Sequence, residues 1–343
     1  MDTYYYRTYR EVQQACRHPD ARVREQALEA LEKEYFELVT PHFLLSLLRK
    51  ADRYTEQSTI LGMMSKLGTR APIEELITIL QDRSDSNPYP RFYVADVLAS
   101  FGERAPVDMF ITILQDPTEE AGLREEIAEL LGEFGERVPL EVLLNAVADP
   151  EPAVCAAGIG SLIARGRAAP LEPILAQLGH PEAYVRKAAV QALSWARERA
   201  PIDPIVAALA DPDGQVREAA AAGVDRLLEW FGTRVPLAPL IAALSDENAS
   251  VRETALDTLA NHPQYAPLDL VVRALDDPGP FVRCAALLVL ERLGSERVPP
   301  EVYPKLQKMA SSDPSNARKY AARALSLLKG LPPPEEPDVF HIG

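Results

Sequence analysis

The segment ERAPIDPIVAALADPDGQVREAAAAG, residues 198–223, contains a proline, an apolar run, an Asp-Pro pair and then Val-Arg followed by alanines. Nearly the same phrase returns as TRVPLAPLIAALSDENASVRETALDTL at residues 233–259. A catalytic loop has no reason to occur twice in one chain, whereas stacked structural units produce such self-similarity. The segment therefore predicts a repeat architecture.

Prolines mark the start of each copy. They open similar apolar runs about 31 to 35 residues apart, at Pro41, Pro72, Pro106, Pro139, Pro170, Pro201, Pro236, Pro267 and Pro299. A run without the proline precedes them near residues 8–16, which makes about ten units. Periods of roughly 20–50 residues indicate supersecondary units that stack side by side.

Each unit is expected to fold as two helices. In PLAPLIAALSD, residues 236–246, apolar residues recur at helical spacing and form one stripe. Proline is tolerated in a first helical turn because its missing N–H would have no partner there. An Asp-Pro or His-Pro pair ends the first helix, since the residue before proline disfavours the α conformation. The second helix begins near Val-Arg, continues through alanines and ends at a glycine.

The Asp-Pro turn, the Val-Arg pair and the alanine-rich helix together resemble the short HEAT-like repeats of the phycobilisome-lyase type, over about residues 9–330. The resemblance implies an all-α, right-handed α-solenoid of about ten two-helix repeats. It implies no single function, because such repeats occur in scaffolds, bilin lyases, DNA glycosylases and metal-dependent hydroxylases. We expect one repeat domain over residues 1–330 and a disordered tail over 331–343, where LPPPEEPDVFHIG leaves the pattern.

The net charge of the chain limits the classes of partner that it can bind. Lys plus Arg number 36 and Asp plus Glu 51, so the net charge is −15. Such a surface repels nucleic-acid backbones and anionic membranes, although a local basic patch can survive within it. No apolar run reaches the roughly 18 residues that span a bilayer, the N-terminus does not resemble a signal peptide, and the three cysteines fit no disulfide or metal pattern. We expect a cytoplasmic protein with no cofactor, whose oligomeric state the sequence leaves open.

Two rows of arginines recur with the repeat. The first row consists of Arg186, Arg217, Arg252 and Arg283. In three of these units an aspartate of the preceding turn lies six residues before the arginine, at Asp211, Asp246 and Asp277. The second row, which includes Arg199 and Arg234, lies two residues before each proline. A row of arginines would suit an anionic ligand, but identical placement in successive units favours a structural ladder within and between repeats. Cys155 stands where a ladder arginine would be.

Departures from the repeat carry more information about function. Val216 and Pro236 are 20 residues apart, where the neighbouring units have 16, which predicts a second helix one turn longer. Trp195 and Trp230, the only tryptophans, each lie six residues before the next proline.

The second helices of such solenoids line a concave groove, and their outward positions here are mostly acidic, Glu253 among them. The predicted contact residues are Lys187, Gln191, Trp195, Glu218, Asp225, Glu229, Trp230, Asp257 and Glu291. An acidic, lightly aromatic groove suits a basic peptide or protein segment. Packing between repeats is the competing interpretation for the tryptophans, and simple solvation for the carboxylates.

No catalytic constellation is recognisable. The chain has no His-Glu dipeptide of the kind that holds iron in HEAT-type hydroxylases, and no phosphate loop, nucleophile elbow or zinc spacing. A DNA glycosylase-like cleft would need basic surroundings, which the net charge opposes. A bilin lyase stays an alternative because those proteins lack a compact motif. The preferred prediction is a non-enzymatic scaffold or adaptor that binds a partner protein or basic peptide.

Overall fold

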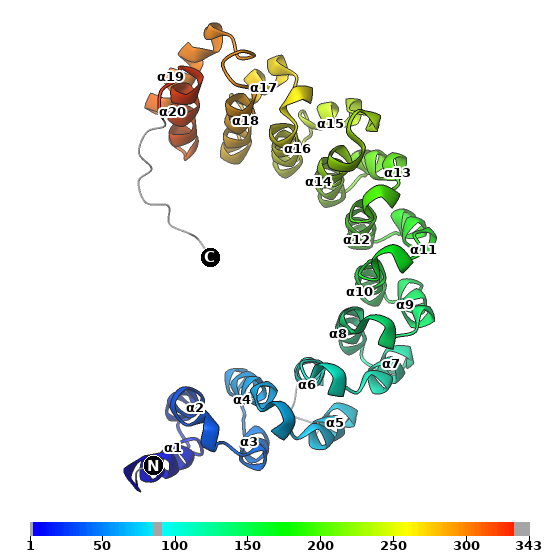
Figure 1. Ribbon diagram of the computed structural model, residues 1–343, viewed down its shortest axis with the longest axis vertical. Helices are drawn as coiled ribbons and strands as arrows, with labels where there is room; N and C mark the ends of the chain where they lie inside the picture. The colour runs from blue at the N-terminus through cyan, green and yellow to red at the C-terminus, as the bar shows by residue number, and fades with distance from the viewer. Residues whose placement is uncertain (1–2, 85–90, 333–343) are drawn as a thin grey trace. The chain divides into compact units, whose positions relative to one another are not determined.

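The computed structural model describes residues 3–84 and 91–332 (Figure 1). These residues form 20 α-helices, joined by turns and short 3-10 helices, and no strand. The chain divides into two compact units, Met1–Ala164 and Arg165–Gly343. A single domain over residues 1–330 therefore stays a prediction, and residues 333–343 of the expected tail lie outside the described residues.

The first unit contains five helix pairs, each packed as a hairpin. Its helices are α1 (Thr3–Ala15), α2 (Ala21–Glu34), α3 (Pro41–Leu48), α4 (Tyr54–Lys66), α5 (Ile73–Gln81), α6 (Arg91–Ala99), α7 (Val107–Gln115), α8 (Ala121–Leu131), α9 (Leu140–Val147) and α10 (Pro152–Ile163).

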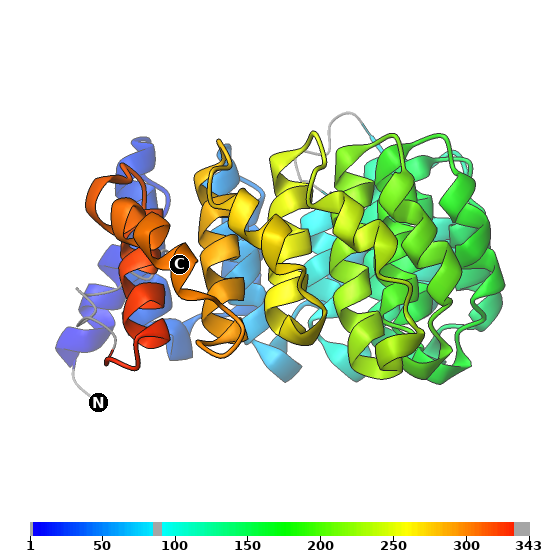
Figure 2. The ribbon, with the colours of Figure 1, turned by 90° about the horizontal axis from the view of Figure 1, so that it is seen from above.

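The second unit contains five more pairs, which Figure 2 shows standing side by side. Its helices are α11 (Glu172–Ala176), α12 (Ala183–Ser194), α13 (Ile202–Ala207), α14 (Gly214–Phe231), α15 (Ala238–Ala243), α16 (Ala249–Asn261), α17 (Leu268–Ala274), α18 (Pro280–Leu293), α19 (Tyr303–Ser312) and α20 (Ala317–Leu328). The prediction of an all-α solenoid of about ten two-helix repeats is confirmed for the described residues.

The helix boundaries follow the local signals with one correction. Pro41 is the first residue of α3, where Thr40 caps the helix by accepting a hydrogen bond from the Phe43 N–H at 3.3 Å. At Pro72 and Pro106, however, ψ is 67° and 65°, outside the α region. In these repeats the proline is the N-cap residue, and the helix begins one residue later than the sequence pattern predicted.

In the second unit, the even-numbered helices form an inner row in which each helix packs directly against the next (Figure 1). One alanine per helix makes this approach possible, at the same place in each repeat and with 0% of its surface exposed: Ala189, Ala220, Ala255, Ala286 and Ala321. The odd-numbered helices contact one another much less, so the inner row lies on the concave side of the unit.

Candidate functional site

Four arginines of the inner row in the second unit make the same set of contacts. The Nε and Nη2 atoms of Arg217 donate to the two carboxylate oxygens of Asp246, in the next repeat, at 2.8 and 2.9 Å. Its Nη1 atom donates to the carbonyls of Asp211 and Pro212, in its own turn, at 2.9 and 3.0 Å. The other pairs of this ladder are Arg186 with Asp211, Arg252 with Asp277, and Arg283 with Asp313.

The ladder aspartates also accept hydrogen bonds from the backbone of their own turn. The Oδ1 atom of Asp246 accepts a hydrogen bond from the Asn248 N–H at 2.8 Å. The Arg217 guanidinium holds the pKa of the Asp246 carboxyl below its usual range, because it donates to the charged form. Arg217 itself has only 9% of its side chain exposed. Both partners are therefore satisfied within the protein, and they hold the repeats in register.

Cys155, in the first unit, replaces a ladder arginine with a buried thiol. Its Sγ donates to the Val147 carbonyl at 3.0 Å, and burial raises the pKa of the thiol to about 11. A protonated, buried thiol is inert toward metals and oxidants at neutral pH.

The outward positions of the inner row carry a different set of carboxylates. We call Glu218 and Asp225 of α14, Glu253 and Asp257 of α16, and Glu291 of α18 the acidic strip. Among the described residues, no cation pairs with Glu218, Glu253 or Asp257. The strip is therefore less compensated than the ladder.

The remaining members of the strip are partly satisfied. Asp225 lies 3.2 Å from both Asn261 Nδ2 and His262 Nε2. Glu291 has 5% of its side chain exposed and contacts Arg323 Nε at 3.5 Å through Oε2. Its Oε1 is buried and has no hydrogen-bond partner among the described residues.

The electrostatics of the strip reflect this imbalance. Burial raises the pKa of Glu253, and the carboxylates of Asp257 and Glu218 raise it further. Burial also raises the pKa of Glu291, although Arg323 opposes the change. A cation placed on the strip would lower both pKa values, because it favours the charged forms.

A second carboxylate pair joins α6 and α8, which pack against each other in the first unit, and was not singled out from the sequence. Burial and a hydrogen bond with Asp96 of α6 raise the pKa of Glu126, on α8, to about 7. The signal was present, because Asp96 follows Arg91 by five residues, as Gln191 follows Arg186. In the sequence, the segment DRSDSNPYPRF at residues 82–92 is longer than the turns of the other units, and this obscured the register.

The two tryptophans have arginine neighbours. Trp195 and Trp230 are 61% and 47% exposed, more than packing between repeats would leave. The guanidinium carbon of Arg226 lies 4.1 Å from the centroid of the Trp195 ring, and that of Arg197 lies 6.0 Å from Trp230. Neither arginine was among the contact residues predicted from the sequence.

The other predicted contact residues lie on α12 and α14. Lys187 donates to the Gln215 side chain at 3.3 Å, and Gln191 and Glu229 are exposed. Most of the predicted contact residues therefore fall into the acidic strip or lie at the two tryptophans, whereas Lys187, Gln191 and Glu229 belong to neither group.

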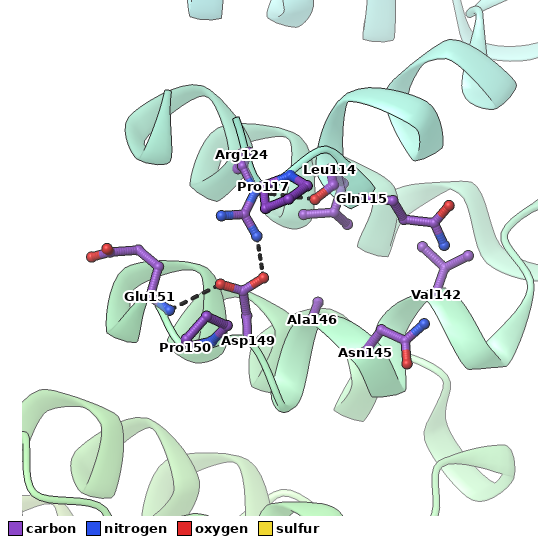
Figure 3. A pocket seen from close by; sticks show the side chains of 10 residues that line it. All are labelled: Leu114, Gln115, Pro117, Arg124, Val142, Asn145, Ala146, Asp149, Pro150 and Glu151. Atoms are coloured by element: carbon purple, nitrogen blue, oxygen red, sulfur yellow. Dashed lines mark hydrogen bonds and ion pairs between the residues drawn. The ribbon is translucent and has the colours of Figure 1, made fainter. Parts of the chain in front are cut away.

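The cavities of the structure lie elsewhere. One of about 520 Å³ in the first unit is a wedge between α7 and α9, bordered by the ion pair of Arg124 with Asp149 (Figure 3). A wedge of about 450 Å³ recurs in the second unit between α13 and α15, with Asp246 in the place of Asp149. A wedge that occurs at equivalent positions in two repeats is explained by the stacking of repeats, without a catalytic role.

Comparisons with known proteins agree with this architecture. A family model described as HEAT repeats matches residues 73–163, 140–225 and 237–326. The solved structure of YibA from Escherichia coli is 22% identical, with a TM-score of 0.58, and the match covers 81% of this chain and 98% of that one. A search of curated protein sequences finds no match.

Two karyopherins are similar in fold. Kap95p, from a study of its binding to RanGDP, is 12% identical with a TM-score of 0.62, over 93% of this chain and 52% of that one. Kap121p, solved bound to the extreme C-terminus of the phosphatase Cdc14p, is 15% identical with a TM-score of 0.55, over 94% and 42%. Within the described ranges, no helix has the length and apolar character needed to cross a membrane.

Proposed function

The chain belongs to the HEAT-repeat family, and we propose that it is a non-enzymatic scaffold whose acidic strip binds a positively charged segment of a partner protein. The observation that carries the proposal is the contrast between two sets of carboxylates. Each ladder aspartate named above has a guanidinium across both its oxygens, whereas Glu218, Glu253 and Asp257 have no described cation.

Gathering like charges on adjacent helices costs stability, and natural proteins tend to keep such costs at functional sites. Lysine or arginine side chains of a partner would supply the missing countercharges.

The fold supports a protein segment as the partner. Kap121p was solved with a protein C-terminus bound to it, which shows that a solenoid of this fold can receive a protein segment. An enzymatic role has less support, because at the two wedge cavities Arg124 pairs with Asp149 and Asp246 pairs with Arg217. Each cavity then has one further charged side chain, Glu151 in the first and Asp203 in the second.

Binding of a fluorescently labelled oligolysine peptide to the full chain, followed by fluorescence anisotropy, tests the proposal. The variant E218Q/E253Q/D257N removes three carboxylates with little change of shape. We expect about tenfold weaker binding, because exposed ion pairs contribute up to about 1 kcal/mol each. Binding of the wild-type chain should also weaken as salt is added.

The control variant is E172Q/D203N/E301Q, which removes the same charge from exposed positions outside the inner row. It should bind oligolysine nearly as well as the wild-type chain. An equal loss in both variants would show that only the net charge attracts the peptide, and no loss in the strip variant would refute the proposed site.

A further inference from the structure

Arg197 has an unusual backbone. It is the only non-glycine residue of the described chain with positive φ, at 54°. Gly166 and Gly232 occupy the equivalent place, four residues before the next repeat begins, with φ of 60° and 52°. Glycine adopts this left-handed conformation without steric cost, whereas arginine does not. The chain keeps a side chain where glycine would be more stable, which points to a use for that side chain.

The Arg197 side chain lies beside a second departure from the repeat. Its guanidinium is 6.0 Å from the Trp230 ring, at the outer limit of cation–π contact. Trp230 lies in the additional turn of α14, which has 18 residues where α12 has 12 and α16 has 13. The predicted longer helix is thus confirmed, and its extra turn brings an indole next to the substituted glycine position.

Two more guanidiniums lie on aromatic rings at the same helix end. Arg226 stacks on Trp195 at 4.1 Å, and Arg234 lies 5.1 Å from the ring of Phe231. We call Trp195, Arg197, Arg226, Trp230, Phe231 and Arg234 the arginine–aromatic cluster. Among the described residues, no carboxylate pairs with any of its three arginines.

Arg234 also departs from its own row. Its equivalent, Arg199, donates to the Arg167 and Ala169 carbonyls of the preceding repeat at 2.8 and 2.6 Å. The extra turn of α14 precedes Arg234 and removes it from that register. The cluster is therefore a locally basic surface in a chain whose net charge is −15.

The chemistry of the cluster selects a ligand. A guanidinium stacked on a ring still presents N–H groups at its edges, and the indoles offer apolar contact. The Nη1 atom of Arg226 donates to Ser194 Oγ and to the Ala222 carbonyl at 3.4 and 3.3 Å, which leaves its Nε and Nη2 atoms for a carboxylate. Tryptophan and arginine are also the residues that most often dominate binding energy at interfaces. We infer that the cluster is a second contact surface, which binds an acidic protein segment that carries a large apolar side chain.

A protein segment fits this surface better than a nucleic-acid strand. Glu229 is exposed on the last turn of α14, and the acidic strip begins on the same helix. These charges would repel a phosphate backbone as soon as it extended beyond the three arginines. A short segment confines its negative charge to the cluster. The inference goes beyond the proposed function, because it concerns a separate surface of opposite charge.

Intrinsic fluorescence reports on the cluster directly, because Trp195 and Trp230 are the only tryptophans of the chain. The probe is a blocked peptide, Asp-Glu-Phe-Glu-Asp, titrated into the full chain. We expect a saturable change in tryptophan emission that weakens with added salt. The same peptide with lysine at each acidic position, and oligothymidylate, serve as comparison ligands.

The decisive variant is Arg197→Gly. Because it relieves the left-handed strain, it should raise the melting temperature by roughly 2–4 °C. It should also weaken the binding of the acidic peptide about tenfold, since one charged hydrogen-bonding group is lost. Weaker binding by a more stable protein cannot result from unfolding. Arg273→Gln, which removes an exposed charge on α17, is the matched control and should leave the affinity unchanged.

Three results would overturn the inference. Arg197→Gly could bind the acidic peptide as tightly as the wild-type chain, the lysine peptide could change the emission as strongly, or oligothymidylate could bind in a manner that depends on Arg197. If the acidic strip proved not to bind a basic segment, these results would be unaffected, because that site is tested with oligolysine and with strip variants.

Discussion

Arg217 and Asp246 join two successive repeats through a two-pronged ion pair, with Nε and Nη2 of the arginine 2.8 and 2.9 Å from the two carboxylate oxygens. The third nitrogen of the same guanidinium binds the carbonyls of Asp211 and Pro212. One side chain thus holds the shape of its own turn and the spacing to the next repeat. Its repetition along the second unit explains why this part of the sequence varies so little from copy to copy.

Removal of the guanidinium should destabilise the protein strongly. We expect Arg217→Met to lower the free energy of unfolding by about 3–5 kcal/mol, because it leaves the Asp246 carboxylate half-buried without a countercharge. Urea denaturation followed by circular dichroism measures the change. Arg273→Met, at an exposed position, should cost less than about 0.5 kcal/mol, and a similar loss in both variants would contradict the role of the ladder.

The inner row should not tolerate larger side chains. Ala220 has none of its surface exposed, so Ala220→Leu should destabilise the chain by about 2–3 kcal/mol through overpacking between adjacent helices. Ala207→Leu, at an exposed position of α13, is the matched control. Thermal unfolding compares the two, and a well-tolerated leucine at position 220 would mean that the helices can move apart without cost.

The Glu126 carboxyl should make stability depend on pH in a defined direction. Its pKa in the folded chain is raised to about 7, above the ordinary value of 4.5. Between these values the folded state holds a proton that the unfolded state has lost, so stability falls as pH rises through this window. Glu126→Gln should therefore raise the melting temperature at pH 8 and change it little at pH 4. The opposite order would show that Glu126 is ionised without penalty.

Binding of a basic segment should release protons from the acidic strip. The pKa of Glu253 is raised by burial and by neighbouring carboxylates, and a bound cation would lower it. Isothermal titration with oligolysine at mildly acidic pH, in buffers that differ in ionisation enthalpy, measures this release. Glu253→Gln should reduce the number of protons released. An unchanged number would place the peptide elsewhere.

The sequence by itself was sufficient for the repeat and for most helix boundaries. Proline, Asp-Pro and Val-Arg act through local conformational preferences, and ten copies of the same signal reinforce one another. The longer second helix could be predicted for the same reason, since Val216 and Pro236 are both local markers. The match to the model of HEAT repeats over residues 73–163, 140–225 and 237–326 agrees with the predicted repeat.

Only the tertiary structure decided which charges remain available. The spacing of Asp211, Arg217 and Asp246 is equally compatible with an ion pair inside a turn and one between turns. The fold places the ion pair between repeats, from Arg217 to Asp246, and inside the turn Arg217 binds only main-chain carbonyls. Arg226 lies 31 residues from Trp195, so no local rule could show that the two stack. Whether a charged side chain finds an oppositely charged partner depends on contacts between repeats, and the sequence pattern of one repeat does not specify those contacts.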